Sequence, residues 1–161
     1  MTQLHPGRMT ASLDGDLVVF LIGMRINSWW RIRQWLPLAR AMRRMQRELA
    51  AHPELGLLGR EAWFTRRIAI DVQYWRSVDH LMGYAHAAQS EHLPAWRDFN
   101  RRMKKAPAGV GIWHETYLVP AGAHEAIYVN MPRFGLGKAG ELVAATGRRE
   151  TARGRLGAEA A

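Results

Sequence analysis

The chain has 161 residues, 48% of them hydrophobic and seven of them tryptophan, which is enough for one folded domain with a sizeable core. It contains no cysteine, so disulfides, thiolate nucleophiles, iron–sulfur clusters and cysteine-rich zinc sites are excluded. The 23 Lys and Arg residues against 14 Asp and Glu give a net charge of +9. No recognised nucleic-acid-binding motif accompanies this charge, so we do not expect a nucleic-acid partner.

The sequence shows no signal for a membrane. Its longest strictly apolar run, residues 17–22, is far shorter than the roughly 20 residues of a spanning helix. Residues 1–16 lack the charged segment, apolar segment and small-residue cleavage site of a secretory signal. We therefore expect no membrane span and a cytoplasmic location.

The first half of the chain begins with a strand followed by a helix. Residues 17–22 are β-branched, aromatic and aliphatic, which predicts a central strand. Ser28 is the expected N-cap of a helix that reaches about Ala51 and carries apolar residues at helical spacing. Pro37 lies within this span and should kink or divide the helix.

Two strands and two helices follow. Residues 57–64 and the alternating segment 68–75 predict a hairpin, because only a short polar stretch separates them. The period then becomes helical, and Ser77 is the expected cap of the next helix. A further helix is predicted over residues 93–105.

The last part of the chain predicts a second hairpin. Residues 112–119 alternate as a fourth strand, and Glu125–Asn130 would form a fifth strand paired with it. We expect three regions: an N-terminal arm over 1–14, a domain over 15–132, and a wrapping or partly disordered tail over 133–161.

The predicted order β-α-β-β-α-β-β is that of an α+β, ferredoxin-like fold, in which an antiparallel sheet carries its helices on one face. The other face of the sheet also needs a cover, and the chain is too short to supply a second helical layer. Pairing of two sheets across a two-fold axis would cover it, so we expect a homodimer.

Five short motifs occur in order along the chain. They are GMRIN at 23–27, YWRS at 74–77, HLPAW at 92–96, GIWHETY at 111–117 and EAIY at 125–128. Together they resemble a bacterial and fungal family of domains that is usually labelled monooxygenase-like. That family is similar to the dimeric α/β-barrel superfamily, which includes antibiotic-biosynthesis monooxygenases, small haem-degrading monooxygenases, chlorite dismutases and aldoxime dehydratases.

The resemblance implies a cavity between sheet and helices, which holds aromatic polyketides in some branches and haem in others. Fold kinship does not choose between these ligands. We expect a monooxygenase-like oxidoreductase that acts on a hydrophobic aromatic or polyketide-like molecule and requires no cofactor. The alternatives are a haem-binding protein or haem-dependent enzyme, and a non-catalytic binding module that uses the basic surface.

His92 is the first candidate for chemistry, because it shares a predicted helical face with Trp96 and Phe99 and should point toward the sheet. An imidazole in an apolar pocket can transfer a proton, and the position of His92 resembles that of the haem ligand in the haem-degrading branch. It would therefore be catalytic, or the iron ligand if haem binds. The alternative is a buried histidine bonded to a backbone carbonyl or a carboxylate. His114 could meet His92 across the cavity or only pack between strands.

Arg25, Asn27 and Trp75 are the other catalytic candidates, because their polar groups are suited to hold an enolate during cofactor-independent oxygenation. Alternatively, Arg25 pairs with a carboxylate and Asn27 caps the next helix. Large aromatic side chains at these periods are also common in cores. The candidate substrate contacts are Trp96, Phe99, His114, Tyr117 and Tyr128.

Overall fold

The computed structural model describes residues 3–105 and 108–157, which form two antiparallel sheets. The larger sheet has the strand order β3-β4-β2-β5. Its strands are β2 (Leu17–Ile26), β3 (Leu57–Phe64), β4 (Ile68–Trp75) and β5 (Val110–Val119). The connecting helices are α1 (Ile32–Ala51), α2 (Val78–His86) and α3 (His92–Lys105).

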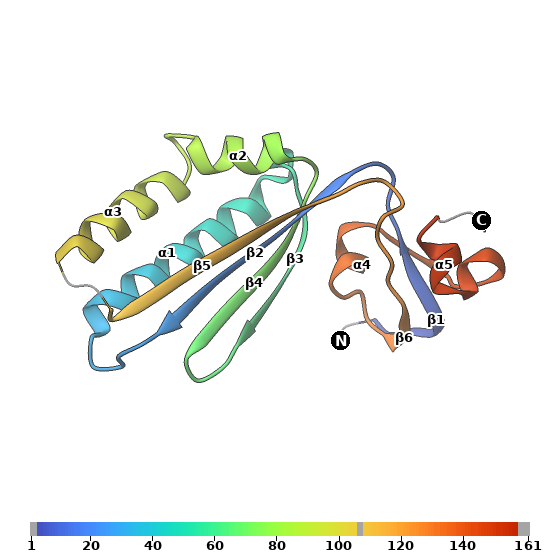
Figure 1. Cartoon of the computed structure of the whole chain (residues 1–161), viewed down its shortest axis with the longest axis horizontal. Helices are drawn as coiled ribbons and strands as arrows, with labels where there is room; N and C mark the ends of the chain where they lie inside the picture. Colours follow the sequence, from blue (N-terminus) through green and yellow to red (C-terminus); the bar gives the residue numbers. More distant parts are fainter. Residues whose placement is uncertain (1–2, 106–107, 158–161) are drawn as a thin grey trace.

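The three helices α1, α2 and α3 lie on one face of the larger sheet (Figure 1). Together with the strand order, this confirms the predicted ferredoxin-like α+β fold. The hairpin of β3 and β4 is also confirmed. Ser77 caps α2 as predicted, because its hydroxyl accepts a hydrogen bond from the backbone N–H of His80 at 3.2 Å.

Helix α1 differs from the prediction at its start. It begins at Ile32, after the N-cap Arg31, and not directly after Ser28. Pro37 lies inside the helix without dividing it. Proline has no N–H, so the carbonyl oxygen of Arg33 lacks its usual helical donor, and Arg102 Nη1 donates to it at 3.2 Å. The proline thus frees an acceptor that links α1 to α3.

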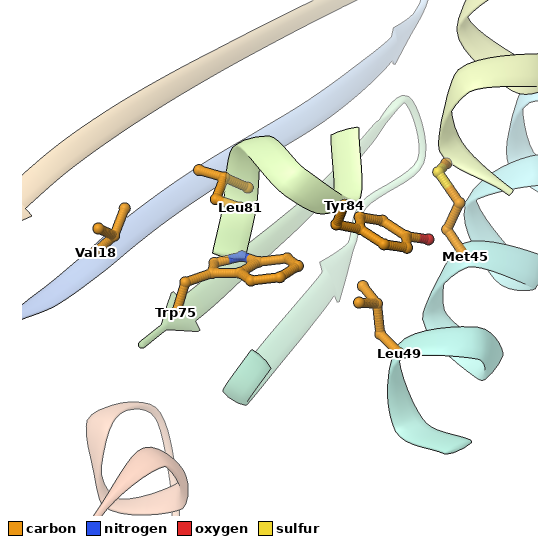
Figure 2. Packing of buried hydrophobic residues seen from close by; sticks show 6 residues of the cluster. All are labelled: Val18, Met45, Leu49, Trp75, Leu81 and Tyr84. Atoms are coloured by element: carbon orange, nitrogen blue, oxygen red, sulfur yellow. The ribbon is translucent and has the colours of Figure 1, made fainter. Parts of the chain in front are cut away.

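The main hydrophobic core joins the end of β4 to helices α1 and α2. Trp75 is only 1% exposed, and its ring centroid lies 5.9 Å from that of Tyr84. Figure 2 shows this pair with Leu81 of α2 and Leu49 of α1 around it. Burying side chains of this size contributes about 1.5–3 kcal/mol each, so this cluster anchors the helical layer to one end of the sheet.

The predicted hairpin between the fourth and fifth strands is wrong. The observed strand β6 (Tyr128–Met131) pairs with β1 (His5–Ser12), and β7 (Glu141–Ala144) pairs with the other edge of β1. A turn does form at Pro120–Ala123, where the Ala123 amide donates to the Pro120 carbonyl at 3.0 Å, but it does not bring β6 back against β5. The Ala121 amide instead donates to Asp16 Oδ1 at 2.9 Å. The segments expected as an arm and a tail therefore supply strands of the second sheet.

The C-terminal segment also contacts the larger sheet on the face opposite to α1–α3. Helix α4 (Leu136–Ala139) lies against β3, where Glu61 Oε1 accepts hydrogen bonds from Lys138 Nζ at 2.8 Å and from the Gly135 amide at 3.1 Å. Phe134 packs edge-on against Trp63 with centroids 5.8 Å apart. The chain therefore covers the β3 side of this face itself.

Across residues 3–105 and 108–157, every helix falls short of what crossing a bilayer requires in length or apolar character.

Candidate functional site

A cavity of about 890 Å³ lies between the larger sheet and helices α1–α3. Ligand sites in proteins commonly enclose about 300–1,000 Å³, so this space is large enough for a polycyclic small molecule. Most of its wall is apolar. The apolar lining includes Phe20, Ile22, Met24, Trp35, Met42 and Phe99.

The sheet side of the cavity carries a buried polar network centred on Asp71. This carboxylate is 3% exposed and accepts hydrogen bonds from Arg60 Nε at 3.0 Å, Gln46 Nε2 at 3.2 Å and Gln73 Nε2 at 3.2 Å. Gln73 Oε1 accepts in turn from Trp75 Nε1 at 2.9 Å. A buried carboxylate needs such partners to offset its desolvation. Asp71 thereby fixes Arg60 and Gln46 in the cavity wall and links β4 to α1.

Two buried donors of cavity-lining residues lack a partner. Within residues 3–105 and 108–157, neither Arg60 Nη2 nor Trp29 Nε1 makes a hydrogen bond. Leaving such a donor buried and unsatisfied costs about 1–3 kcal/mol, and in native proteins a water or ligand usually satisfies it. Both residues line the cavity, so these two donors belong to its wall.

His92 lines the same cavity from α3. Its Nδ1 lies 2.9 Å from the carbonyl oxygen of Ala85, and a carbonyl only accepts, so Nδ1 carries the hydrogen. In the neutral ring, Nε2 then holds the lone pair and can accept a proton or bind a metal. Among the described residues, no three His, Asp or Glu side chains are grouped as around a metal ion.

A partly buried pair of side chains, Tyr84 and Glu48, lies next to His92. The Tyr84 hydroxyl donates to Glu48 Oε2 at 2.7 Å, and the same carboxylate accepts from the Glu91 amide at 3.0 Å. Burial, and then the hydrogen bond to Glu48, raise the pKa of Tyr84 far above its usual range. The hydroxyl therefore stays protonated and keeps α1 attached to α2 and to the residue that precedes His92.

Three predicted substrate contacts lie with His92. Trp96, Phe99 and His114 all line the cavity. Trp96 and Phe99 stack with centroids 5.8 Å apart, and His114 packs against Phe20 at 5.7 Å. The structure therefore brings these residues of α3 and β5 to one cavity.

Arg25 and Asn27 lie elsewhere. Met24 and Ile26 line the cavity, whereas Arg25, between them on β2, is exposed on the opposite face of the strand. Its guanidinium donates to the side-chain oxygen of Asn27. Neither side chain lines the cavity, so the structure does not bring this predicted pair to His92.

The remaining three candidates also lie outside the cavity lining. Trp75 is in the core; its indole donates to Gln73 and packs against Tyr84, which in turn packs against His92. Tyr117 is half exposed on the sheet face opposite to the helices. Tyr128 is buried in the second sheet, where its hydroxyl accepts from the Gly137 amide at 2.9 Å.

Arg60, Asp71 and Gln46 are not among the residues predicted from the sequence. In β4, the alternation of Ile68, Ile70, Val72 and Tyr74 predicts the strand but not which of its faces meets the helices. The helix-facing set is instead Ala69, Asp71, Gln73 and Trp75, of which the last three are buried. One signal in the sequence could have identified this network. Asp71 and Gln73 come just before Trp75 and alternate with the apolar residues of the other strand face.

Comparisons with known proteins agree with the fold. The family model described as monooxygenase af470-like matches residues 17–136, which include the whole larger sheet and α1–α3. A curated relative, monooxygenase af470 of Aspergillus fumigatus, is 28% identical over 160 residues. That match covers 86% of this chain and 56% of the relative, so the chain spans little more than half of its length.

Two solved structures are also similar. Aldoxime dehydratase OxdRE, in complex with butyraldoxime, has a TM-score of 0.66 at 15% identity, covering 84% of this chain and 39% of that one. SnoaB, a cofactor-independent oxygenase from Streptomyces nogalater, has a TM-score of 0.43 at 15% identity, covering 63% of this chain and 91% of that one. At this identity, the likeness to OxdRE is one of fold alone.

Proposed function

Because this chain belongs to the monooxygenase af470-like family, we propose that it oxidises a hydrophobic aromatic or polyketide-like small molecule in the cavity between sheet and helices. One observation carries this proposal: Arg60 Nη2 is buried and has no hydrogen-bond partner among the described residues. Arg60 lines the cavity, whose wall is otherwise mostly apolar. Apolar walls would bind the body of a substrate. A desolvated donor would stabilise a negatively charged oxygen more strongly than water does.

The proposed reaction needs no external reductant. The substrate has a methylene group that is conjugated to a carbonyl, either directly or through an aromatic ring, so loss of one proton gives a stabilised enolate. Dioxygen then takes electrons from this enolate. In the net reaction the methylene carbon becomes a carbonyl, one oxygen atom of O₂ enters the product, and the other leaves as water with the two methylene hydrogens. The substrate supplies all the electrons.

His92 and Arg60 have complementary roles in this proposal. Nε2 of His92, freed by the bond between Nδ1 and Ala85, accepts the methylene proton from the helical side. Arg60 Nη2 donates to the enolate oxygen from the sheet side, while Asp71 holds the guanidinium through Nε. Trp29 Nε1 is a second donor for an oxygen of the substrate.

Oxygen labelling tests the proposal. Anthrone, an aromatic ketone with an acidic methylene, is incubated with the protein under ¹⁸O₂, and the product is analysed by mass spectrometry against a protein-free control. We expect the ketone at the former methylene to carry one ¹⁸O atom. A protein-dependent product without ¹⁸O, or formation no faster than in the control, would contradict monooxygenation of this substrate class.

One observation favours a second candidate function, haem binding. The hydrogen bond from His92 Nδ1 to the Ala85 carbonyl is the arrangement that orients metal-binding histidines, and the cavity beside it is large and mostly apolar. His92 would hold the iron, and bound haem would supply redox chemistry. Titration with haemin should give a Soret band that His92→Ala abolishes. A spectrum of free haemin throughout would exclude this candidate.

We also propose that two copies pair through the sheet face opposite to the helices. On its β2 and β5 side, this face carries Val19, Leu21 and Trp113, beside the half-exposed Tyr117. Trp113 lies over Gly23, where even a Cβ atom would come within 2.5 Å of the indole. Apart from Glu115 beside Leu21, these residues give this side of the face an apolar surface suited to a second copy.

A further inference from the structure

We infer that the molecule bound in the cavity carries a carboxylate head group, which arginines at the cavity rim bind. The rim arginines are Arg40, Arg43, Arg66 and Arg67. This inference rests on the proposed function for the identity of the substrate site. It defines the substrate class more closely, as an amphiphilic acid that binds more tightly than a comparable neutral hydrophobe.

The rim arginines come from two segments that border the cavity. Arg40 and Arg43 are three residues apart on α1 and therefore share a helix face. Arg66 and Arg67 lie in the turn between β3 and β4. All four residues line the cavity and are also exposed to solvent. They consequently lie where the cavity meets water, which is where the charged end of an amphiphile would stay.

None of the described residues neutralises the charge of the rim. In the part of the chain that the structure describes, Arg40, Arg43, Arg66 and Arg67 form no salt bridge, whereas nearby Arg44, Arg101 and Arg102 pair with Glu91 or Asp98. Among the described lining residues, the one carboxylate is that of Asp71, and Arg60, Gln46 and Gln73 already bind it. A cleft lined by charges of one sign concentrates ligands of the opposite sign.

One rim side chain is already oriented. Arg67 Nη1 donates to the carbonyl oxygens of Asn27 at 3.1 Å and Ile26 at 3.4 Å, which restricts the guanidinium without neutralising it. Arginine and carboxylate form charge-assisted, often bidentate hydrogen bonds, so a carboxylate is a suitable partner. With the head group bound at the rim, the apolar part of the ligand would extend toward the aromatic wall of Trp35 and Phe99.

The test compares a charged ligand with its neutral ester. Binding of cis-parinaric acid and of its methyl ester is followed by fluorescence under nitrogen, so that no oxidation is needed. We expect the acid to bind about tenfold more tightly than the ester, since hydrogen bonds between an arginine and a carboxylate are stronger than those between neutral groups. Arg43→Gln and Arg66→Gln should each weaken binding of the acid several-fold and leave binding of the ester unchanged.

Arg47→Gln is the matched control. Arg47 is exposed on α1, and within the described residues it neither lines the cavity nor forms a salt bridge, so this variant removes the same charge away from the rim. It should bind the acid as the wild type does. Equal affinities for acid and ester, or an equal loss in Arg47→Gln and Arg43→Gln, would overturn the inference.

The propionates of haem are also carboxylates. A parallel titration with haemin and haemin dimethyl ester therefore shows whether the rim binds the propionates of haem or the head group of an aliphatic acid. If the rim binds propionates, Arg43→Gln weakens binding of haemin but not of its ester, and parinaric acid does not bind. If the rim binds an aliphatic acid, the parinarate pair shows the difference. Because these assays measure binding without turnover, loss of the carboxylate preference overturns this inference alone, whereas failed oxygen labelling overturns the proposed function.

Discussion

The Nδ1 atom of His92 donates a hydrogen bond to the carbonyl oxygen of Ala85, 2.9 Å away. This bond crosses from α3 to the end of α2 and leaves Nε2 as the ring nitrogen that can act on a ligand. His86 makes the same bond, from Nδ1 to the Met82 carbonyl at 2.9 Å, but it is exposed and does not line the cavity. The chain thus contains an internal control for the chemistry of His92.

Asp71→Asn should destabilise the protein, because Arg60 would lose the charge that compensates it in the cavity wall. Breaking a buried ion pair typically costs about 3–5 kcal/mol, and the partial exposure of Arg60 places the expected loss near the lower end. Urea unfolding measures the change in the free energy of unfolding. Asp98→Asn is the control: its salt bridges to Arg101 and Arg102 lie on the surface, so about 1 kcal/mol or less is expected. Similar losses in the two variants would contradict the role given to Asp71.

The raised pKa of Tyr84 predicts a loss of stability at high pH. Above the ordinary tyrosine pKa of 10.0, the unfolded chain ionises this hydroxyl while the folded protein keeps it protonated. The free energy of unfolding should therefore fall as pH rises, by up to about 1.4 kcal/mol per pH unit from this residue. Tyr84→Phe removes that contribution, so its stability should decline less steeply between about pH 9 and 11 in urea unfolding. Burial also raises the pKa of Tyr74 and Tyr128, so some decline remains. Parallel curves for wild type and variant would show that Tyr84 is not responsible.

The proposed dimer predicts a specific effect of Leu21→Glu. This substitution puts a charge on the apolar sheet face, beside Glu115 on the neighbouring strand, and should convert a dimer into a monomer. Light scattering at micromolar concentration measures the mass. Leu118→Glu, at an exposed β5 position that pairs with Val18 and points to the other face, should leave the dimer intact. A monomeric wild type would reject the dimer.

The sequence pattern was sufficient for most of the fold, because local periodicity determines strands and helices. The segments 57–64 and 68–75 were predicted with the observed bounds, and the cap at Ser77 followed from its chemistry. The partner of the strand near Tyr128 could not be predicted in this way. Its pairing with Met9 joins residues far apart in the chain, and no local pattern records such a contact.

The site was only partly predictable for a related reason. His92, Trp96 and Phe99 share one helix face, so the helical period brought them together correctly. Arg25 was assigned by its place at the end of a strand, but alternation along the strand turns it to the opposite face. Asp71 and Arg60 meet across two strands, and the sequence does not reveal that register.

The most direct test of the account compares anthrone-dependent oxygen uptake by wild type, His92→Ala and His86→Ala, after circular dichroism has shown that all three are folded. General-base catalysis typically contributes about 10²–10⁴-fold, so His92→Ala should lose at least about a hundredfold in rate. His86→Ala should keep the wild-type rate. If His92→Ala consumes oxygen as fast as the wild type, or if His86→Ala loses as much, His92 is not the base and the central claim fails.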